Sequence, residues 1–218
     1  MTINNDNKDK RALLVISHLA VGDDQKWKDL YSFLDTSGIA LADTLLAGKY
    51  GLYEKLEKTQ ATKSEFIKKI SSFDADPKIE AIDVILHLHG TKGKLVFAGD
   101  TISTADLKKE LKSQKINKKL RLLYSTACYG ESHANDFVDA GFKAASGAVG
   151  VNTNSPYEYP IVLTMWANGS KFREAIAVGE NPYIRAATDG AASLLLFPDA
   201  DSDKIIYGNS KISINTFL

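Results

Sequence analysis

Short, mostly apolar runs separated by amphipathic segments constrain the fold of this chain more than any other feature of its sequence. The clearest runs span residues 12–16, 83–90 and 120–128. Such runs are typical of strands in a parallel sheet, because helices cover both faces of that sheet and leave no solvated side. The segments between them carry the helix period; residues 24–34, for example, repeat apolar side chains at i, i+3, i+4 and i+7. The pattern predicts an α/β fold, with a mainly parallel sheet between two layers of helices.

Two places in the sequence mark the start of a helix. Thr62 and Glu65 form a capping box, in which each side chain can bond the other residue's backbone N–H group. Asn181 and Pro182 suit the N-cap and the first helical position. We therefore expect one helix after Thr62 and another that extends from Pro182 to about residue 195.

Glycine, asparagine and serine mark the turns between the remaining elements. Residues 93–100 contain a Gly-Asp turn and predict an antiparallel flap. We expect a short strand at residues 53–56, a polar loop at 152–155 before a helical piece at 160–167, and two short strands around a turn at 208–209.

Composition and charge narrow the class of protein. The chain has 218 residues, of which 44% are hydrophobic, which is enough for one sizeable domain. We expect a flexible polar tail at residues 1–10 and a single domain at 11–218. The 27 basic residues equal the 27 acidic ones, so the sequence predicts neither nucleic acid nor an anionic membrane as a partner.

The number of cysteines and the lack of long apolar runs indicate the cellular compartment of the protein. One cysteine excludes an internal disulfide and fits a reducing environment. The first ten residues lack the apolar core of a signal peptide, and no run approaches the roughly 20 apolar residues that span a bilayer. We therefore expect a cytoplasmic protein.

A histidine and the only cysteine lie where two of the apolar runs end. His89 and Gly90 close one run, and Cys128 closes another. The carboxyl ends of neighbouring parallel strands converge on one crevice, where ligands bind in sheets of this kind. A thiol needs a base to supply thiolate near neutral pH, and a histidine provides one. The N–H groups of Gly90 and Cys128 could hold the oxygen of a tetrahedral intermediate, so the pattern predicts a nucleophilic Cys/His site.

Other interpretations of these residues remain open. A lone buried cysteine is often a small core residue. His87 and His89 make an HxH pair that could begin a metal site, but no further ligand follows at a useful spacing, so we expect no metal and no cofactor. His87 is expected to be a packed residue. His133 could compete as the base, although the short helix predicted there would carry it away from Cys128.

The order of these features resembles the caspase-like cysteine peptidases of clan CD. His-Gly follows an apolar strand, a flap and a helix come next, and a second apolar strand ends in Ala-Cys-x-Gly; the resemblance covers about residues 11–195. It implies a three-layer α/β/α sandwich with a mainly parallel six-stranded sheet. His89 would be the general acid/base and Cys128 the nucleophile, with the amides of Gly90 and Cys128 as the oxyanion hole. The substrate, a peptide or protein, would lie as an extended strand along residues 152–156.

The specificity residues of this clan do not carry over. Caspases place Gln two residues before the cysteine and prefer aspartate at P1, whereas metacaspases place Asp there and prefer Arg or Lys; this chain has Thr126. Glu131 and Asp100 are candidate acidic walls for a basic P1 residue, although exposed carboxylates on loops are usually solvated. The residues expected to contact substrate are Thr126, Asn152, Thr153, Asn154 and Ser155.

The leading hypothesis is a cysteine endopeptidase that hydrolyses peptide bonds through a Cys/His dyad and a thioester. The alternative is a catalytically silent caspase-like module that binds a peptide or protein partner, because a motif indicates common ancestry and does not by itself establish catalysis. A glutamine amidotransferase ranks low, since those enzymes place the cysteine before the histidine in the chain.

Overall fold

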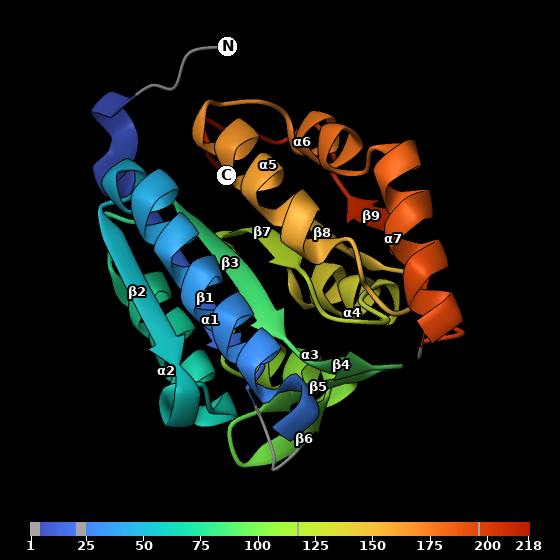
Figure 1. Cartoon of the computed structure of the whole chain (residues 1–218). Coiled ribbons are helices and arrows are strands. Elements are labelled where there is room, and N and C mark those ends of the chain that lie inside the picture. Colours follow the sequence, from blue (N-terminus) through green and yellow to red (C-terminus); the bar gives the residue numbers. More distant parts are fainter. Residues whose placement is uncertain (1–4, 21–24, 117, 196) are drawn as a thin grey trace.

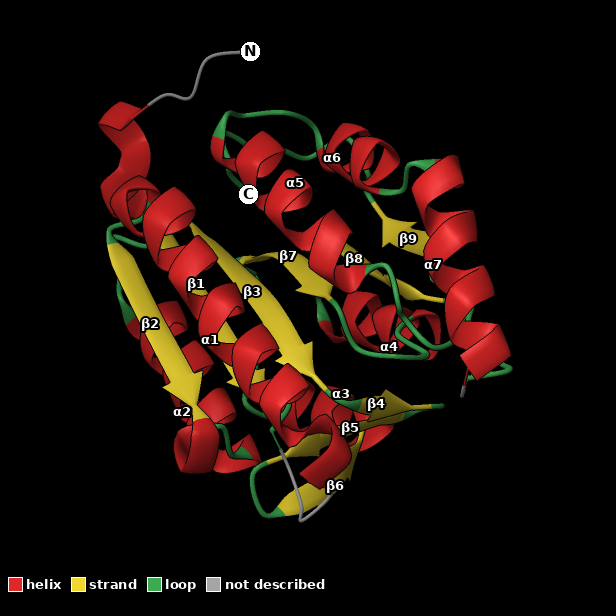
Figure 2. Cartoon of the chain, in the orientation of Figure 1, coloured by secondary structure: helices red, strands yellow, loops and turns green. Residues whose placement is uncertain are grey.

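The computed structural model describes residues 5–20, 25–116, 118–195 and 197–218 as three layers, with a sheet between two groups of helices (Figures 1 and 2). The sheet has six strands in the order β2-β1-β3-β7-β8-β9. Neighbouring strands are parallel except for β8 and β9. The predicted α/β fold with a mainly parallel six-stranded sheet is therefore confirmed. The strands are β1 (Arg11–His18), β2 (Leu52–Glu57), β3 (Ala81–Leu88), β7 (Leu120–Ser125), β8 (Ala144–Ala148) and β9 (Lys204–Gly208).

Helices cover both faces of this sheet. Apolar side chains of α1, α5 and α6 pack on one face, and those of α2, α3 and α4 pack on the other. Within the described ranges, no helix is both long enough and apolar enough to cross a membrane. The helices are α1 (Gln25–Leu46), α2 (Lys63–Ala75), α3 (Thr104–Ser113), α4 (Glu131–Ala140), α5 (Ser155–Ala167), α6 (Phe172–Gly179) and α7 (Pro182–Leu195).

The central strands are buried along almost their whole length, as continuous apolar runs require. Every residue of β3 and β7 is buried. The two strands pair in parallel up to Leu86 and Ser125, and the N–H of Thr126 then donates to the carbonyl of Leu86 at 2.9 Å. Their carboxyl ends therefore lie side by side, which positions the segments that follow them.

The predicted helix starts are confirmed. Thr62 is the N-cap of α2, and its hydroxyl accepts a hydrogen bond from the N–H of Glu65 at 3.2 Å. The Asn181 side chain accepts from the N–H of Tyr183 at 3.0 Å, and α7 begins at Pro182.

A small antiparallel sheet follows β3 and confirms the predicted flap. It has the order β4-β5-β6, and Gly99 makes its second turn with a φ of 86°, in the left-handed region that favours glycine. Its strands are β4 (Gly90–Thr91), β5 (Lys94–Phe97) and β6 (Asp100–Ser103).

The two ends of the chain differ in part from expectation. Residues 5–10 of the predicted flexible tail form a short 3-10 helix, η1 (Asn5–Lys10), and Lys10 pairs with Glu80 at 2.8 Å; residues 1–4 lie outside the described residues. The expected strand after Gly208 is wrong. Ile212 and Ile214 bury their side chains there instead, and Arg121 donates to the carbonyl of Ile214 at 2.7 Å. The remaining 3-10 turns are η2 (Ala47–Lys49) and η3 (Lys58–Gln60).

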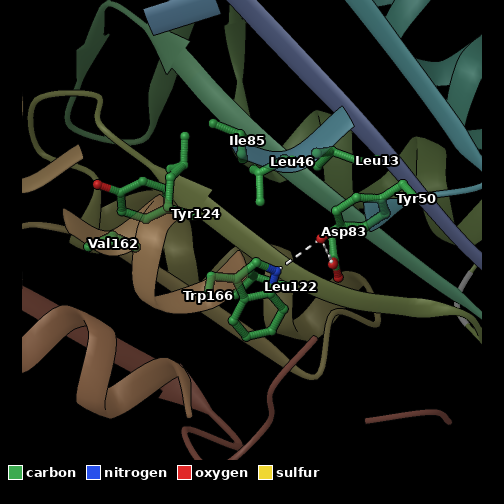
Figure 3. A pocket seen from close by; sticks show the side chains of 10 residues that line it. Leu13, Leu46, Tyr50, Asp83, Ile85, Leu122, Tyr124, Val162 and Trp166 are labelled. Atoms are coloured by element: carbon green, nitrogen blue, oxygen red, sulfur yellow. Dashed lines mark hydrogen bonds between the residues drawn. The ribbon is translucent and has the colours of Figure 1, made fainter. Parts of the chain in front are cut away.

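Figure 3 shows side chains of β3, β7 and α5 that line a small cavity, among them Asp83, which belongs to a buried ion pair. The Arg121 guanidinium donates to both oxygens of Asp83, at 2.8 and 2.6 Å. The Tyr50 hydroxyl also donates to Asp83 at 2.6 Å, and the indole N–H of Trp166 donates to Tyr50 at 2.9 Å. The cavity volume is about 10 Å³, room for about one water molecule, so this region serves packing.

Candidate active site

A pocket of about 350 Å³ lies where β3 and β7 end. His89 follows β3 directly, and Cys128 lies three residues beyond β7, so the structure brings both residues predicted for the dyad to this one pocket. The predicted site residues that line it are His89, Gly90, Thr126, Cys128, Asn152, Thr153 and Ser155.

The His89 imidazole is oriented by a main-chain carbonyl. Its Nε2 lies 2.7 Å from the carbonyl oxygen of Leu19, and the ring of Tyr31 meets it edge-on with centroids 4.6 Å apart. Because a carbonyl only accepts, Nε2 carries the proton and the neutral ring leaves Nδ1 unprotonated. Burial lowers the pKa of His89 below its ordinary value of 6.5. The side chain is therefore a neutral base at pH 7.

The loop that supplies this carbonyl is held by Asp35 of α1. The Asp35 carboxylate accepts from the backbone N–H of Leu19 at 3.0 Å, from that of Ala20 at 2.9 Å and from the Ser17 hydroxyl at 2.5 Å. Sequence reasoning missed both Leu19 and Asp35. A main-chain carbonyl has no residue-type signal, and the aspartate lies one residue beyond the end of the helix predicted at 24–34.

Cys128 carries a protonated thiol at neutral pH. It is half-buried, and desolvation raises its pKa above 9.0. The backbone N–H of Asn152 and the charge of Lys204 act in the opposite direction and lower that pKa in part. No hydrogen bond joins the Cys128 and His89 side chains, both of which are described, so the resting pair is neutral and separate. Catalytic contacts of this kind commonly tighten only when substrate binds.

A tight turn presents the cysteine. Tyr129 has a φ of 54°, a left-handed conformation that is uncommon for a bulky residue, and its N–H donates to the carbonyl of Gly150 at 2.7 Å. A Cβ at Gly90 would lie 2.5 Å from the Cys128 carbonyl oxygen, a distance that real Cβ atoms essentially never show. Glycine at position 90 therefore lets the two strand-end loops pack directly on each other.

His87 and Thr126 contribute an uncharged part of the pocket wall. His87 Nε2 lies 3.2 Å from the carbonyl of Leu34 and must carry the proton there, so Nδ1 accepts from the Thr126 hydroxyl at 2.7 Å. Complete burial lowers the pKa of His87 to about 4. His87 is the packed residue that its sequence position predicted.

The segment after β8 is not the extended edge that we expected. Val151 bridges Ala200, and the carbonyl of Asn154 accepts from the N–H groups of two residues of α5. Helix α5 begins at Ser155 and has Pro156 in its first turn, five residues before the predicted start at 160. Proline lacks an N–H and has a helical φ, so it favours the start of a helix over an edge strand.

The four residues predicted in this segment divide into two groups. Asn152, Thr153 and Ser155 line the pocket, and the Asn152 side-chain amide donates to the Thr126 carbonyl at 3.0 Å. Asn154 is fully buried away from it and donates to the carbonyl of Gly179 at 3.3 Å. The prediction of Asn154 as a substrate contact is wrong, because its side chain fixes the α5–α6 packing.

Three other candidates lie away from the pocket wall. His133 on α4 is fully buried, and its Nε2 lies 2.6 Å from the carbonyl of Thr91. Glu131 accepts from the Tyr207 hydroxyl at 3.3 Å, and Asp100 accepts from the N–H of Thr101 at 2.7 Å. None of the three is among the described residues that line the pocket. Groups of His, Cys, Asp and Glu that could hold a metal ion are also absent from the described parts of the chain.

Comparison with known proteins gives a structural match and no sequence match. No family model matches the chain, and no curated protein matches it. A solved structure that it resembles is a secreted C11 cysteine protease from Bacteroides thetaiotaomicron in complex with an irreversible peptide inhibitor, with a TM-score of 0.55 and 12% sequence identity. The match covers 92% of this chain and 66% of the protease, just under two thirds of its length. At this identity the match shows the fold alone: the chain shares the α/β architecture of that protease.

Proposed function

We propose that the protein is a cysteine peptidase that cleaves peptide bonds with Cys128 as nucleophile and His89 as general acid/base. The observation that carries this proposal is the convergence of the two side chains on one pocket, with His89 Nδ1 unprotonated and its ring oriented by Leu19. The structural similarity to a cysteine protease supports the reaction class. The peptide or protein substrate enters the same pocket.

The first half of the reaction forms a thioester. As Cys128 Sγ attacks the carbonyl carbon, its proton passes to His89 Nδ1, and the carbonyl π electrons move to oxygen. The backbone N–H groups of Gly90 and Cys128 stabilise that oxyanion, and each such donor contributes about 3–4 kcal/mol of transition-state stabilisation. The C–N bond then breaks, and His89 gives its proton to the leaving amine.

The second half regenerates the thiol. Water attacks the thioester carbonyl while His89 Nδ1 accepts one of its protons. The C–S bond breaks, the peptide leaves as a carboxylic acid, and the proton returns from His89 to sulfur. The uncharged resting dyad fits this cycle, since no stable thiolate–imidazolium pair has to form before substrate arrives.

Digestion of a defined mixture of peptides tests the proposal. Mass spectrometry of new termini should detect cleavage by the wild-type protein, and Cys128→Ala and His89→Ala should each abolish it. Ser113→Ala is the control and should leave cleavage unchanged, because Ser113 is an exposed residue of α3 outside the pocket and its hydroxyl donates to the Glu110 carbonyl at 2.8 Å. A folded wild-type protein that cleaves nothing, or a Cys128→Ala variant that retains full activity, would overturn the proposal and favour a peptide-binding module.

A further inference from the structure

The described lining of the pocket beside Cys128 carries no charged side chain. Among the described residues that line it there is no Asp, Glu, Lys or Arg. One side is apolar and comes from α1, from the first turn of α5 and from the segment after α7. Its members are Leu30, Tyr31, Leu34, Pro156 and Phe197. Its volume of about 350 Å³ falls in the range of about 300–1,000 Å³ that is usual for ligand pockets.

The two histidines of the pocket do not supply a positive charge at neutral pH. His87 is fully buried and bonded through both ring nitrogens, to Leu34 and Thr126. Burial lowers the pKa of His87 to about 4 and also lowers that of His89. The described lining of the pocket is therefore neutral at pH 7.

Several charged side chains near the pocket have partners of their own. The Asp35 carboxylate is bonded to the backbone N–H groups of Leu19 and Ala20. Lys204 is fully buried, donates to the Ser125 carbonyl at 2.8 Å and lies 3.2 Å from Glu158. Asp189 accepts from the Thr153 hydroxyl at 2.6 Å and Asp199 from the Tyr129 hydroxyl at 3.2 Å, and Lys92 lies over the Tyr129 ring, 5.8 Å from its centroid. Each of these described groups is thus already engaged within the chain.

The polar side of the pocket offers an acceptor rather than a charge. Asn152 is 93% buried, and its Oδ1 has no hydrogen-bond partner among the described residues. Buried acceptors of this kind are normally satisfied, so the atom suits an incoming neutral donor such as a peptide N–H.

We infer that the pocket takes an uncharged, bulky apolar side chain, such as Leu, Met or Phe, at the P1 position of the substrate. This inference rests on the proposed peptidase function. A charged P1 side chain would lose its hydration in a pocket that offers it no opposite charge, whereas an apolar one would bury its surface against the α1 side. The preference differs from that of caspases and metacaspases, whose specificity residue is replaced here by Thr126.

A series of peptides that differ only at P1 tests this inference. We expect kcat/KM for Leu, Met or Phe to exceed that for Arg, Lys or Asp by about 100-fold or more, because a buried unpaired charge is strongly disfavoured. A matched pair of variants at Ser155 then tests whether an added charge creates activity toward basic P1 residues. Ser155→Asp places a carboxylate on the pocket wall in the first turn of α5, where the helix favours negative charge, and should raise kcat/KM for Arg and Lys by about tenfold. Ser155→Asn, of similar size and neutral, should not.

The possible outcomes separate this inference from the proposed function. If the wild-type protein cleaves the Arg, Lys or Asp peptides best, the P1 assignment is wrong and the peptidase function stands. If a folded protein cleaves no peptide of the series and forms no acyl adduct at Cys128, the peptidase function fails and the P1 assignment fails with it. The wild-type series decides the matter even where a Ser155 variant does not fold.

Discussion

His89 Nε2 lies 2.7 Å from the carbonyl oxygen of Leu19, and this contact fixes which nitrogen of the imidazole faces the chemistry. A main-chain carbonyl can only accept, so it selects the tautomer that leaves Nδ1 as the base. Leu19 belongs to a loop, and loops are held less rigidly than strands. The Asp35 carboxylate removes that freedom by accepting from the N–H groups of Leu19 and Ala20.

Asp35 is therefore predicted to be a positioning residue for His89. Asp35→Asn replaces one acceptor oxygen with a donor that faces backbone N–H groups, so the loop shifts and the imidazole loses its alignment. We expect kcat/KM for peptide hydrolysis to fall about tenfold or more, mainly through kcat. The Asp35 charge also raises the pKa of His89, so its removal should move the acid limb of the pH profile to lower pH.

Asp43→Asn is the matched control for Asp35. Asp43 lies two turns further along α1, where it accepts from the Tyr53 hydroxyl at 2.8 Å and pairs with Lys55 at 2.9 Å. Its replacement should leave the acid limb in place. If Asp35→Asn and Asp43→Asn have the same pH profile, Asp35 has no effect on His89.

The acid limb of kcat/KM is expected below pH 6.5. Only neutral His89 accepts the thiol proton, so activity falls as the pH drops through the pKa of that side chain. Burial lowers this pKa from its ordinary value, which extends activity toward acid. Initial rates with one peptide at low concentration, measured from pH 4.5 to 8, give the midpoint directly. A midpoint above 6.5 would contradict a neutral, partly buried imidazole at position 89.

The Cys128 thiol is expected to react slowly with alkylating agents near neutral pH. Desolvation raises its pKa above 9.0, so the reactive thiolate is rarer than in an unfolded chain. Cys128 is the only cysteine, which makes the denatured protein an internal reference. The iodoacetamide rate at pH 7.5 should be lower for the folded protein than for the same chain in denaturant. Faster alkylation of the folded state would show a thiolate already formed at rest.

Gly90→Ala is predicted to destabilise the protein and to disturb the cysteine loop. The added Cβ would lie 2.5 Å from the Cys128 carbonyl oxygen and 2.8 Å from His133 Cε1, so both must move. Overpacking of this kind costs about 1–3 kcal/mol of unfolding free energy. Gly48→Ala is the control, because a Cβ there meets nothing within 4 Å. Denaturant titration should separate the two variants, and equal stability would refute the close approach.

The sequence alone was sufficient to predict the central sheet and to place His89 and Cys128 at neighbouring strand ends. Buried parallel strands show themselves as unbroken apolar runs, and their topology brings His89 and Cys128 to one edge without further information. Helix starts were equally readable, because side chains such as Thr62 and Asn181 bond nearby N–H groups.

The extent of helix α1 and the role of Asn154 depend on long-range packing, which local sequence patterns do not reveal. Helix α1 continues through Gly38 to Leu46, although glycine disfavours a helix interior. A Cβ at Gly38 would lie 3.2 Å from the His87 ring, so tertiary packing overrides local preference at this position. The same holds for Asn154, whose place in the segment implied by the family resemblance suggested a substrate contact, and whose side chain instead joins α5 to α6.

Covalent labelling by a peptidyl acyloxymethyl ketone tests the central claim most directly. The wild-type protein would be incubated with probes carrying Leu, Arg, Lys or Asp at P1, and the adduct located by intact mass and peptide mapping. The Cys128–His89 dyad predicts a single adduct at Cys128 that is lost in His89→Ala while the variant keeps its fold. A folded wild-type protein that no probe labels, or equal labelling in His89→Ala, would contradict the dyad.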